Sequence, residues 1–211
     1  RFTHDLYMIT NSDSILSILT KLTHLFKHNS IPNPDVEAAY LISHVTTIPH
    51  LELSLYYTRI LTSDEAEQLD EYVNRRLNRE PLQYILGETE FFGLLIKLTP
   101  DVLIPRPETE LLVERIIKDS ISYSNNSRDI KLLDLCTGSG CIAIALKNQL
   151  PTWKIEASDI SEAAVSIAKS NAKSHCLDIT FYQSNLFEDI PEPESEEDRY
   201  DFIVSNPPYI S

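Results

Sequence analysis

Glycine is scarce in this chain: its 211 residues include only Gly87, Gly93, Gly138 and Gly140. Glycine enters left-handed backbone conformations without a steric penalty, and it lets a ligand approach the main chain closely. A chain so poor in glycine is expected to keep it where no side chain is tolerated. Because two of the four stand at positions 138 and 140, this short segment is the first candidate for a functional loop.

Cysteine is also rare. The chain has three, Cys136, Cys141 and Cys176, an odd number without any Cys-x-x-Cys pair. Such a set argues against a disulfide framework and against a structural zinc site, and it is typical of a reducing compartment. No metal ion is therefore expected in the protein.

Basic residues are outnumbered, with 18 Lys and Arg against 32 Asp and Glu, a formal net charge of −14 and a pI of about 4.8. Phosphate binding requires clustered Lys and Arg, so direct nucleic-acid binding is not expected. Much of the acidity lies in residues 188–201, which we interpret as a solvated loop. Long apolar runs are lacking too. No segment approaches the ~18 residues of a membrane-spanning helix, so no membrane association is expected.

The first part of the chain has the apolar spacing of helices. Apolar side chains recur every three or four positions over Ser12–His28, which predicts a helix with one apolar stripe. Asn33-Pro34 is a typical helix start, with asparagine as the cap and proline in the first turn. Thr62 and Glu65 match a capping box ahead of another helix. Residues 1–80 are therefore predicted to form a small helical bundle.

The pattern changes after residue 80. Residues 81–105 form a connector in which Glu90–Leu98 is predicted to be a strand of a hairpin, with Gly87 and Gly93 at turns or bulges. Over residues 106–211, short apolar runs alternate with helical spacing, which predicts right-handed βαβ crossovers and a parallel sheet of the α/β class. The expected strands are Ile130–Leu135, Trp153–Ala157, Ile179–Gln183 and Phe202–Val204, and the expected helices are Cys141–Leu150 and Glu162–Ala172.

The segment Leu132–Gly140 leaves a predicted strand and enters a predicted helix. Gly138 and Gly140 would let the main chain pass close to a ligand, with the first amides of the helix available to it. A glycine pair by itself is equally compatible with a tight turn. Asp159 favours a ligand, because it stands nineteen residues past Gly140 at the end of the next strand. Its carboxylate can there accept both hydroxyl hydrogens of a ribose.

The same loop indicates which ribose-bearing ligand it suits. Ala143 stands where a dinucleotide fingerprint usually has a third glycine. Asp134, four residues before Gly138, suits the methyltransferase form of the loop, in which a carboxylate helps to orient the methionine end of the cofactor. The predicted cofactor is therefore S-adenosylmethionine.

A second motif, Asn206-Pro207-Pro208-Tyr209, ends the fourth predicted strand at the same edge of the sheet. An amide or arylamine nitrogen is a poor nucleophile because its lone pair is delocalised. The side-chain oxygen of Asn206 and the carbonyl of Pro207 would hold its two N–H groups and aim the lone pair at the methyl group. Pro208 stiffens the loop, and Tyr209 offers a ring that stacks on a planar group. Asn206, Pro207 and Tyr209 are therefore the predicted catalytic residues.

Together these features resemble the HemK-type (PrmC-like) protein-glutamine methyltransferases, which modify the glutamine of the Gly-Gly-Gln motif in peptide-chain release factors. The segment Ile104–Glu110 (IPRPETE) is the most family-specific, since Asn-Pro-Pro-Tyr also marks amino-methylating DNA enzymes. The resemblance covers almost the whole chain and includes Glu80–Gly87, Phe92-Gly93, Val102–Glu110, Asp134–Gly140 and Asn206–Tyr209.

The resemblance implies a class I S-adenosylmethionine-dependent methyltransferase that acts in translation termination. Its Rossmann-like sheet would follow a helical domain that helps to dock the release factor. It implies the site as well, with Asn206 beside both cofactor and substrate. The cofactor would be lined by Cys136, Thr137, Gly138, Ser139, Gly140, Asp159 and Phe187, and the glutamine would be held by Asn206, Pro207, Pro208 and Tyr209.

The chain departs from the family pattern in two respects. Cys136 stands where the family usually has another glycine, so its backbone must adopt a conformation that a cysteine tolerates. The chain also begins at Arg1 and stops at Ser211, so we expect a preceding segment and the last strands of the sheet to lie outside this sequence.

Two other functions remain open. An adenine amino-methyltransferase would use the same motif on a flipped base, and the acidic charge and the Arg-Pro-Glu-Thr-Glu segment argue against it. A non-catalytic cofactor-binding or adaptor protein is disfavoured by the intact motif. The serine-rich, glycine-poor composition favours a mitochondrial location, or the cytoplasm if the protein is bacterial.

Overall fold

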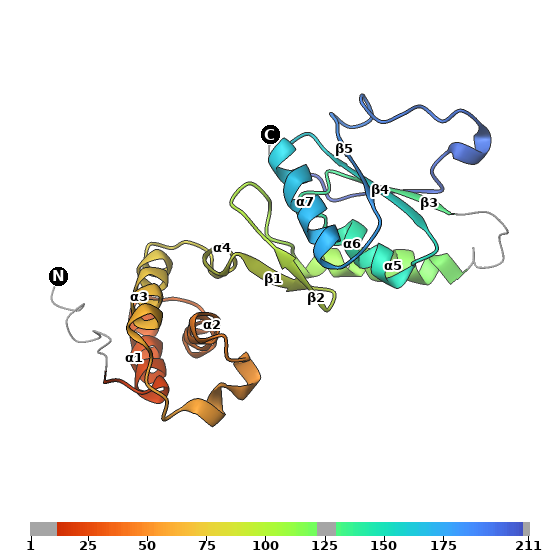
Figure 1. Cartoon of the computed structure of the whole chain (residues 1–211). Helices are drawn as coiled ribbons and strands as arrows, with labels where there is room; N and C mark the ends of the chain where they lie inside the picture. The colour runs from red at the N-terminus through yellow and green to blue at the C-terminus, as the bar shows by residue number, and fades with distance from the viewer. Residues whose placement is uncertain (1–11, 122–129, 209–211) are drawn as a thin grey trace. The chain divides into compact units, whose positions relative to one another are not determined.

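The computed structural model describes residues 12–121 and 130–208. The chain divides into two compact units, residues 1–86 and 87–211 (Figure 1). In neither unit does a described helix have the length and apolar character needed to cross a membrane.

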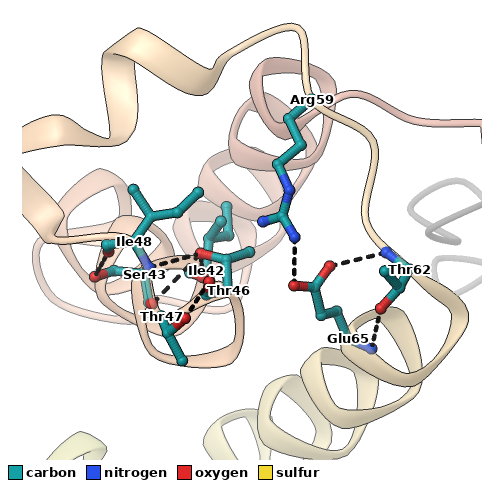
Figure 2. A network of polar contacts seen from close by, with 8 residues as sticks. All are labelled: Ile42, Ser43, Thr46, Thr47, Ile48, Arg59, Thr62 and Glu65. Atoms are coloured by element: carbon teal, nitrogen blue, oxygen red, sulfur yellow. Dashed lines mark hydrogen bonds and ion pairs between the residues drawn. The ribbon is translucent and has the colours of Figure 1, made fainter.

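The first unit is helical, as predicted. Its helices bury one apolar stripe each, and the buried side chains of α1, which include Ile15, Ile18 and Leu22, pack with those of α2 and α3 in one core. The capping box of Thr62 and Glu65 is confirmed, with bonds of 2.8 and 3.3 Å (Figure 2). The elements are α1 (Ile15–His28), α2 (Pro34–Thr46), the 3-10 helix η2 (His50–Tyr56), α3 (Ser63–Leu77) and α4 (Leu82–Leu86).

The predicted capping role of Asn33 is wrong. Pro34 does begin α2, but Asn33 has a left-handed backbone with φ of 45° and its side chain makes no capping hydrogen bond. A capping side chain needs an extended backbone to fold back over the first free amides. In the left-handed conformation of Asn33 that geometry is lost.

Polar contacts close the loops around α2 and α3 (Figure 2). Ser43 Oγ donates to the carbonyl of Ile48 over 2.6 Å, which closes the end of α2. Arg59 Nη2 donates over 2.6 Å to Glu65, the same carboxylate that caps α3. These local bonds lie at the end of α2 and at the start of α3.

The second unit opens with a hairpin of β1 (Glu88–Phe91) and β2 (Leu94–Lys97). The predicted hairpin and the turn at Gly93 are confirmed, but the unbroken strand expected over Glu90–Leu98 is wrong, because the chain reverses inside that segment. Phe92 and Gly93 form the turn, both with positive φ (52° and 73°). A two-residue hairpin turn of type I′ requires this left-handed pair. The sequence gives no sign of the left-handed conformation at Phe92, because a bulky residue within an apolar run seldom adopts it.

The main sheet of this unit is parallel, in the order β5-β4-β3-β6. The chain passes from β3 to β4 to β5 by right-handed crossovers that run in one direction, so α6 and α7 lie on the same face of the sheet (Figure 1). Helix α5 lies beside α6. The α/β fold class is thus confirmed. The elements are α5 (Pro107–Ser120), β3 (Lys131–Leu135), α6 (Cys141–Gln149), β4 (Lys154–Asp159), α7 (Glu162–Ser174), β5 (Thr180–Gln183) and β6 (Phe202–Ser205).

The acidic segment between β5 and β6 is exposed over most of its length, as predicted for a solvated loop, and carries the short 3-10 helix η4 (Glu196–Asp198). Ile190 is its buried anchor and packs with Leu133 and Leu135 of β3. The chain then returns as β6 beside β3, so the carboxyl ends of the four parallel strands meet at one edge. That edge is where ligands bind in open α/β sheets.

Candidate active site

The loop after β3 is built from left-handed residues. Cys136, Gly138 and Gly140 have φ of 60°, 54° and 82°. A Cβ on Gly140 would lie 3.0 Å from that of Ala168, so this glycine lets α6 pack against α7. A Cβ on Gly138 would meet no atom within 4 Å. The main chain at Gly138 is therefore open to a ligand, which is what a cofactor loop needs.

Asp159 lies against this loop, as its spacing predicts. Its Oδ2 accepts a hydrogen bond of 2.9 Å from the N–H of Gly138, and its Oδ1 accepts one of 3.0 Å from the N–H of Ser161. The sequence assigned both oxygens to a ribose, whereas each already accepts one main-chain N–H. A carboxylate oxygen has a second lone pair, so Asp159 can shape the loop and still accept hydroxyl groups.

Asp134 is fully buried beneath the loop. Its Oδ2 accepts bonds from Thr137 Oγ1 at 2.6 Å and from the N–H of Ala143 at 3.2 Å. Within the described residues its Oδ1 has no hydrogen-bond partner, and burial raises the pKa of this carboxyl to about 7. In the structure the carboxyl of Asp134 braces the loop from inside, and its predicted part in orienting the methionine end of the cofactor stays a prediction.

The side chains of Cys136, Thr137 and Ser139 are buried or half-buried. Thr137 and Ser139 have buried side chains. Burial raises the pKa of the half-buried Cys136 thiol, with the carboxylates of Asp159 and Asp134 acting in the same direction. The backbone of Cys136 is left-handed, like those of Gly138 and Gly140 in the same loop.

Apolar side chains are exposed on the loops after β4 and β5. Phe187, which the resemblance places at the cofactor, is 51% exposed, and its neighbour Leu186 is 55% exposed. Ile160, which directly follows Asp159, is 67% exposed and was missed, although its position after a strand-end carboxylate was a signal. The buried Ser184 holds the second loop, donating to the carbonyl of Leu186 and accepting from Asp189.

Asn206 stands at the end of β6, next to the end of β3. Ser205 Oγ donates over 2.8 Å to the carbonyl of Leu135, which joins the Asn-Pro-Pro segment to the base of the cofactor loop. Asn206 Nδ2 donates over 3.2 Å to Thr109 Oγ1 in the first turn of α5. Pro207 and Pro208 are exposed, and Tyr209 lies outside the described residues.

Asn171 of α7 is another residue that the sequence analysis missed. It is fully buried, and its Nδ2 donates to the carbonyls of Ser139 at 2.9 Å and of Lys97 at 3.0 Å. Its Oδ1 accepts from the N–H of Lys97 at 2.9 Å. One side chain thus connects the cofactor loop to the hairpin, and no local pattern around a helical asparagine signals this.

These residues fit the predicted cofactor. Gly138 leaves an open approach to the main chain, Asp159 can accept hydroxyl hydrogens, and exposed apolar side chains stand at the neighbouring strand ends. The described residues contain no group of three His, Cys, Asp or Glu that could hold a metal ion.

The chain is similar to known proteins in both of its units. Residues 17–87 match the PrmC N-terminal domain, and residues 107–211 match the methyltransferase small domain. The chain is 39% identical over 204 residues to the release factor glutamine methyltransferase of Coxiella burnetii, covering 96% of this chain and 69% of that protein. It is 36% identical to the release factor glutamine methyltransferase of Leptospira interrogans, covering 94% of this chain and 68% of that protein. The solved human methyltransferase 10 domain containing protein is 29% identical over 56% of each chain, with a TM-score of 0.46.

The parallel sheet, the glycine loop that enters α6 and the matched methyltransferase domain define a class I S-adenosylmethionine-dependent methyltransferase. Within that class, the chain belongs to the release factor glutamine methyltransferase family.

Proposed function

We propose that this protein transfers a methyl group from S-adenosylmethionine to the side-chain amide nitrogen of the glutamine in the Gly-Gly-Gln motif of a peptide-chain release factor. The observation that carries the proposal is the position of Asn206. It stands at the end of β6, whose last residue is hydrogen-bonded to the base of the cofactor loop.

The cofactor loop binds and orients the methyl donor. In the proposed complex the Gly138 main chain lies against the cofactor, which agrees with the open space around Gly138. Asp159 accepts the ribose hydroxyl groups, which agrees with its position beside the loop. When bound, S-adenosylmethionine supplies a methyl group already activated on a cationic sulfur. The protein therefore needs no strong general base, and its contribution is to orient the acceptor.

The Asn-Pro-Pro-Tyr segment holds the acceptor. A glutamine side chain offers two N–H donors on a planar nitrogen. Asn206 Oδ1 accepts one and the Pro207 carbonyl accepts the other, which favours pyramidalisation of the nitrogen. Tyr209 stacks on the amide plane in this proposal. The helical first unit, residues 1–86, would contact the release factor away from its glutamine.

The experiment is to incubate the protein with radiolabelled S-adenosylmethionine and either a release factor, the same factor with its Gly-Gly-Gln glutamine changed to glutamate, or double-stranded DNA. Label on the unchanged factor alone is the expected result. Label on DNA would instead identify the adenine amino-methyltransferase. Label on the glutamate variant would show that another side chain is the acceptor.

Salt dependence offers an independent check. A nucleic-acid enzyme that makes several phosphate contacts loses orders of magnitude in affinity between ~50 and ~200 mM salt. The net charge of −14 leaves this protein without an excess of cations for such contacts, so activity should change little over that range.

A further inference from the structure

We infer that Thr109 is the positioning residue that sets which end of the Asn206 amide faces the substrate. The inference deepens the proposed function and rests on it, because Asn206 is the residue proposed to hold the glutamine nitrogen. It identifies a role for the Arg-Pro-Glu-Thr-Glu segment in the reaction.

In this contact the Asn206 amide is the donor and the Thr109 hydroxyl is the acceptor. Asn206 Nδ2 donates to Thr109 Oγ1 over 3.2 Å. A primary amide has a donor end and an acceptor end, and only the oxygen can accept an N–H of the substrate. Because the nitrogen is turned towards Thr109, the oxygen lies on the opposite arm of the amide. A flipped Asn206 would instead set its own N–H groups against those of the glutamine.

Thr109 is well suited to hold that contact. Its side chain is buried, with 7% of the residue exposed, and its β-branched side chain has restricted rotamers in a helix. Its N–H donates to the carbonyl of Arg106 over 2.9 Å at the start of α5. The next residue, Glu110, accepts a bond of 2.8 Å from the N–H of Phe92 in the hairpin turn. The first turn of α5 is therefore fixed from two sides.

Three substitutions separate the hydroxyl from the shape of the residue. Thr109→Val keeps the branched shape and removes the hydroxyl, whereas Thr109→Ser keeps the hydroxyl. Thr180→Val is the matched control, because Thr180 is exposed at the amino end of β5, opposite the site. The measurements are the single-turnover methylation rate of a release factor at saturating cofactor, and cofactor affinity by calorimetry.

We expect Thr109→Val to lower the rate about 5- to 10-fold, the scale of one neutral hydrogen bond, with cofactor affinity within about 2-fold of wild type. Thr109→Ser should recover most of the rate, and Thr180→Val should leave it unchanged. In an Asn206→Ala background, Thr109→Val should have no further effect, because the two residues act through one contact. A wild-type rate for Thr109→Val, an equal loss in Thr109→Ser, or a further loss in the double variant would overturn the inference.

A second measurement does not depend on activity. In the protein without substrate, the side-chain amide proton resonances of Asn206 should shift in Thr109→Val and not in Thr109→Ser. Unchanged resonances in Thr109→Val would overturn the inference even if the release factor is the substrate. Shifted resonances in a protein that does not methylate a release factor would uphold the contact and overturn the proposed function alone.

Discussion

The main-chain N–H of Gly138 donates a hydrogen bond of 2.9 Å to Oδ2 of Asp159, which joins the loop after β3 to the end of β4. The carboxylate proposed to bind the ribose therefore also shapes the loop that receives the rest of the cofactor. Both roles are removed together when the carboxylate is lost.

Replacing Asp159 tests this double role. Asp159→Ala should weaken S-adenosylmethionine binding by about 1.5–3 kcal/mol, the scale of hydrogen bonds to a charged group. Isothermal titration calorimetry measures the change, and Asp178→Ala, an exposed aspartate after α7, is the control expected to bind normally. Wild-type affinity in Asp159→Ala would remove Asp159 from the cofactor site.

Asn206 should act on the rate and not on cofactor binding. Losing one preorganised polar partner of a transition state typically costs about 100- to 1000-fold, or ~2.7–4 kcal/mol. Asn206→Ala should show a loss of this size in single-turnover methylation of a release factor. Cofactor affinity should change much less. Asn206→Asp keeps an acceptor, so it should retain more activity than alanine if acceptance is the main role. Near wild-type rates for Asn206→Ala would rule out this mechanism.

The buried Asp134 should make stability depend on pH. Burial raises its pKa to about 7 in the folded state, whereas the usual value of 3.8 applies to the unfolded chain. Between these values the folded state binds the additional proton, so stability is lost as the pH rises towards 7, at about 1.4 kcal/mol per pH unit. Urea unfolding at pH 5 and 7.5 should show wild type losing roughly 2–3 kcal/mol relative to the uncharged Asp134→Asn. A parallel response of the two proteins would contradict the raised pKa.

Cys136 should be a strained residue. It has a φ of 60°, in the left-handed region that costs a side-chain-bearing residue about 1–2 kcal/mol. Cys136→Gly should raise the free energy of unfolding by about 0.5–1 kcal/mol after the larger entropy of unfolded glycine is deducted. Cys176→Gly, at a φ of 56° on the surface, should gain similarly, whereas Cys136→Ser should gain nothing. A gain in the serine variant would show that the thiol, and not the backbone, is the cause.

Asn171 should contribute strongly to the stability of the second unit. Asn171→Ala would leave the Ser139 carbonyl and both main-chain groups of Lys97 without this partner, at roughly 1–3 kcal/mol for a buried group. Thermal unfolding should show a loss of at least that size, and Asn148→Ala on the exposed face of α6 is the control. If both variants melt together, the contact between hairpin and cofactor loop is not important for stability.

Local features were determined by the sequence alone. The capping box of Thr62 and Glu65 uses residues three positions apart, so the pattern contains all of its partners. The alternation of strands and helices similarly predicted the parallel sheet and the edge at which Gly138 and Asp159 meet. The physical reason is that hydrogen bonds within one turn, and the periodic burial of neighbouring side chains, depend on few residues.

Other features were decided only by the tertiary structure. Asn206 and Thr109 are hydrogen-bonded although they are 97 positions apart in the sequence, and Asn171 and Lys97 are hydrogen-bonded although they are 74 positions apart. The left-handed turn at Phe92 lies within an apolar run, and Asp134 turned out to be sealed beneath its loop. Such pairings depend on how α5, α7 and the hairpin pack, and no local pattern records which buried polar group will satisfy another. The sequence therefore determined the motifs of the site, and the packing of distant segments decided how its side chains are held.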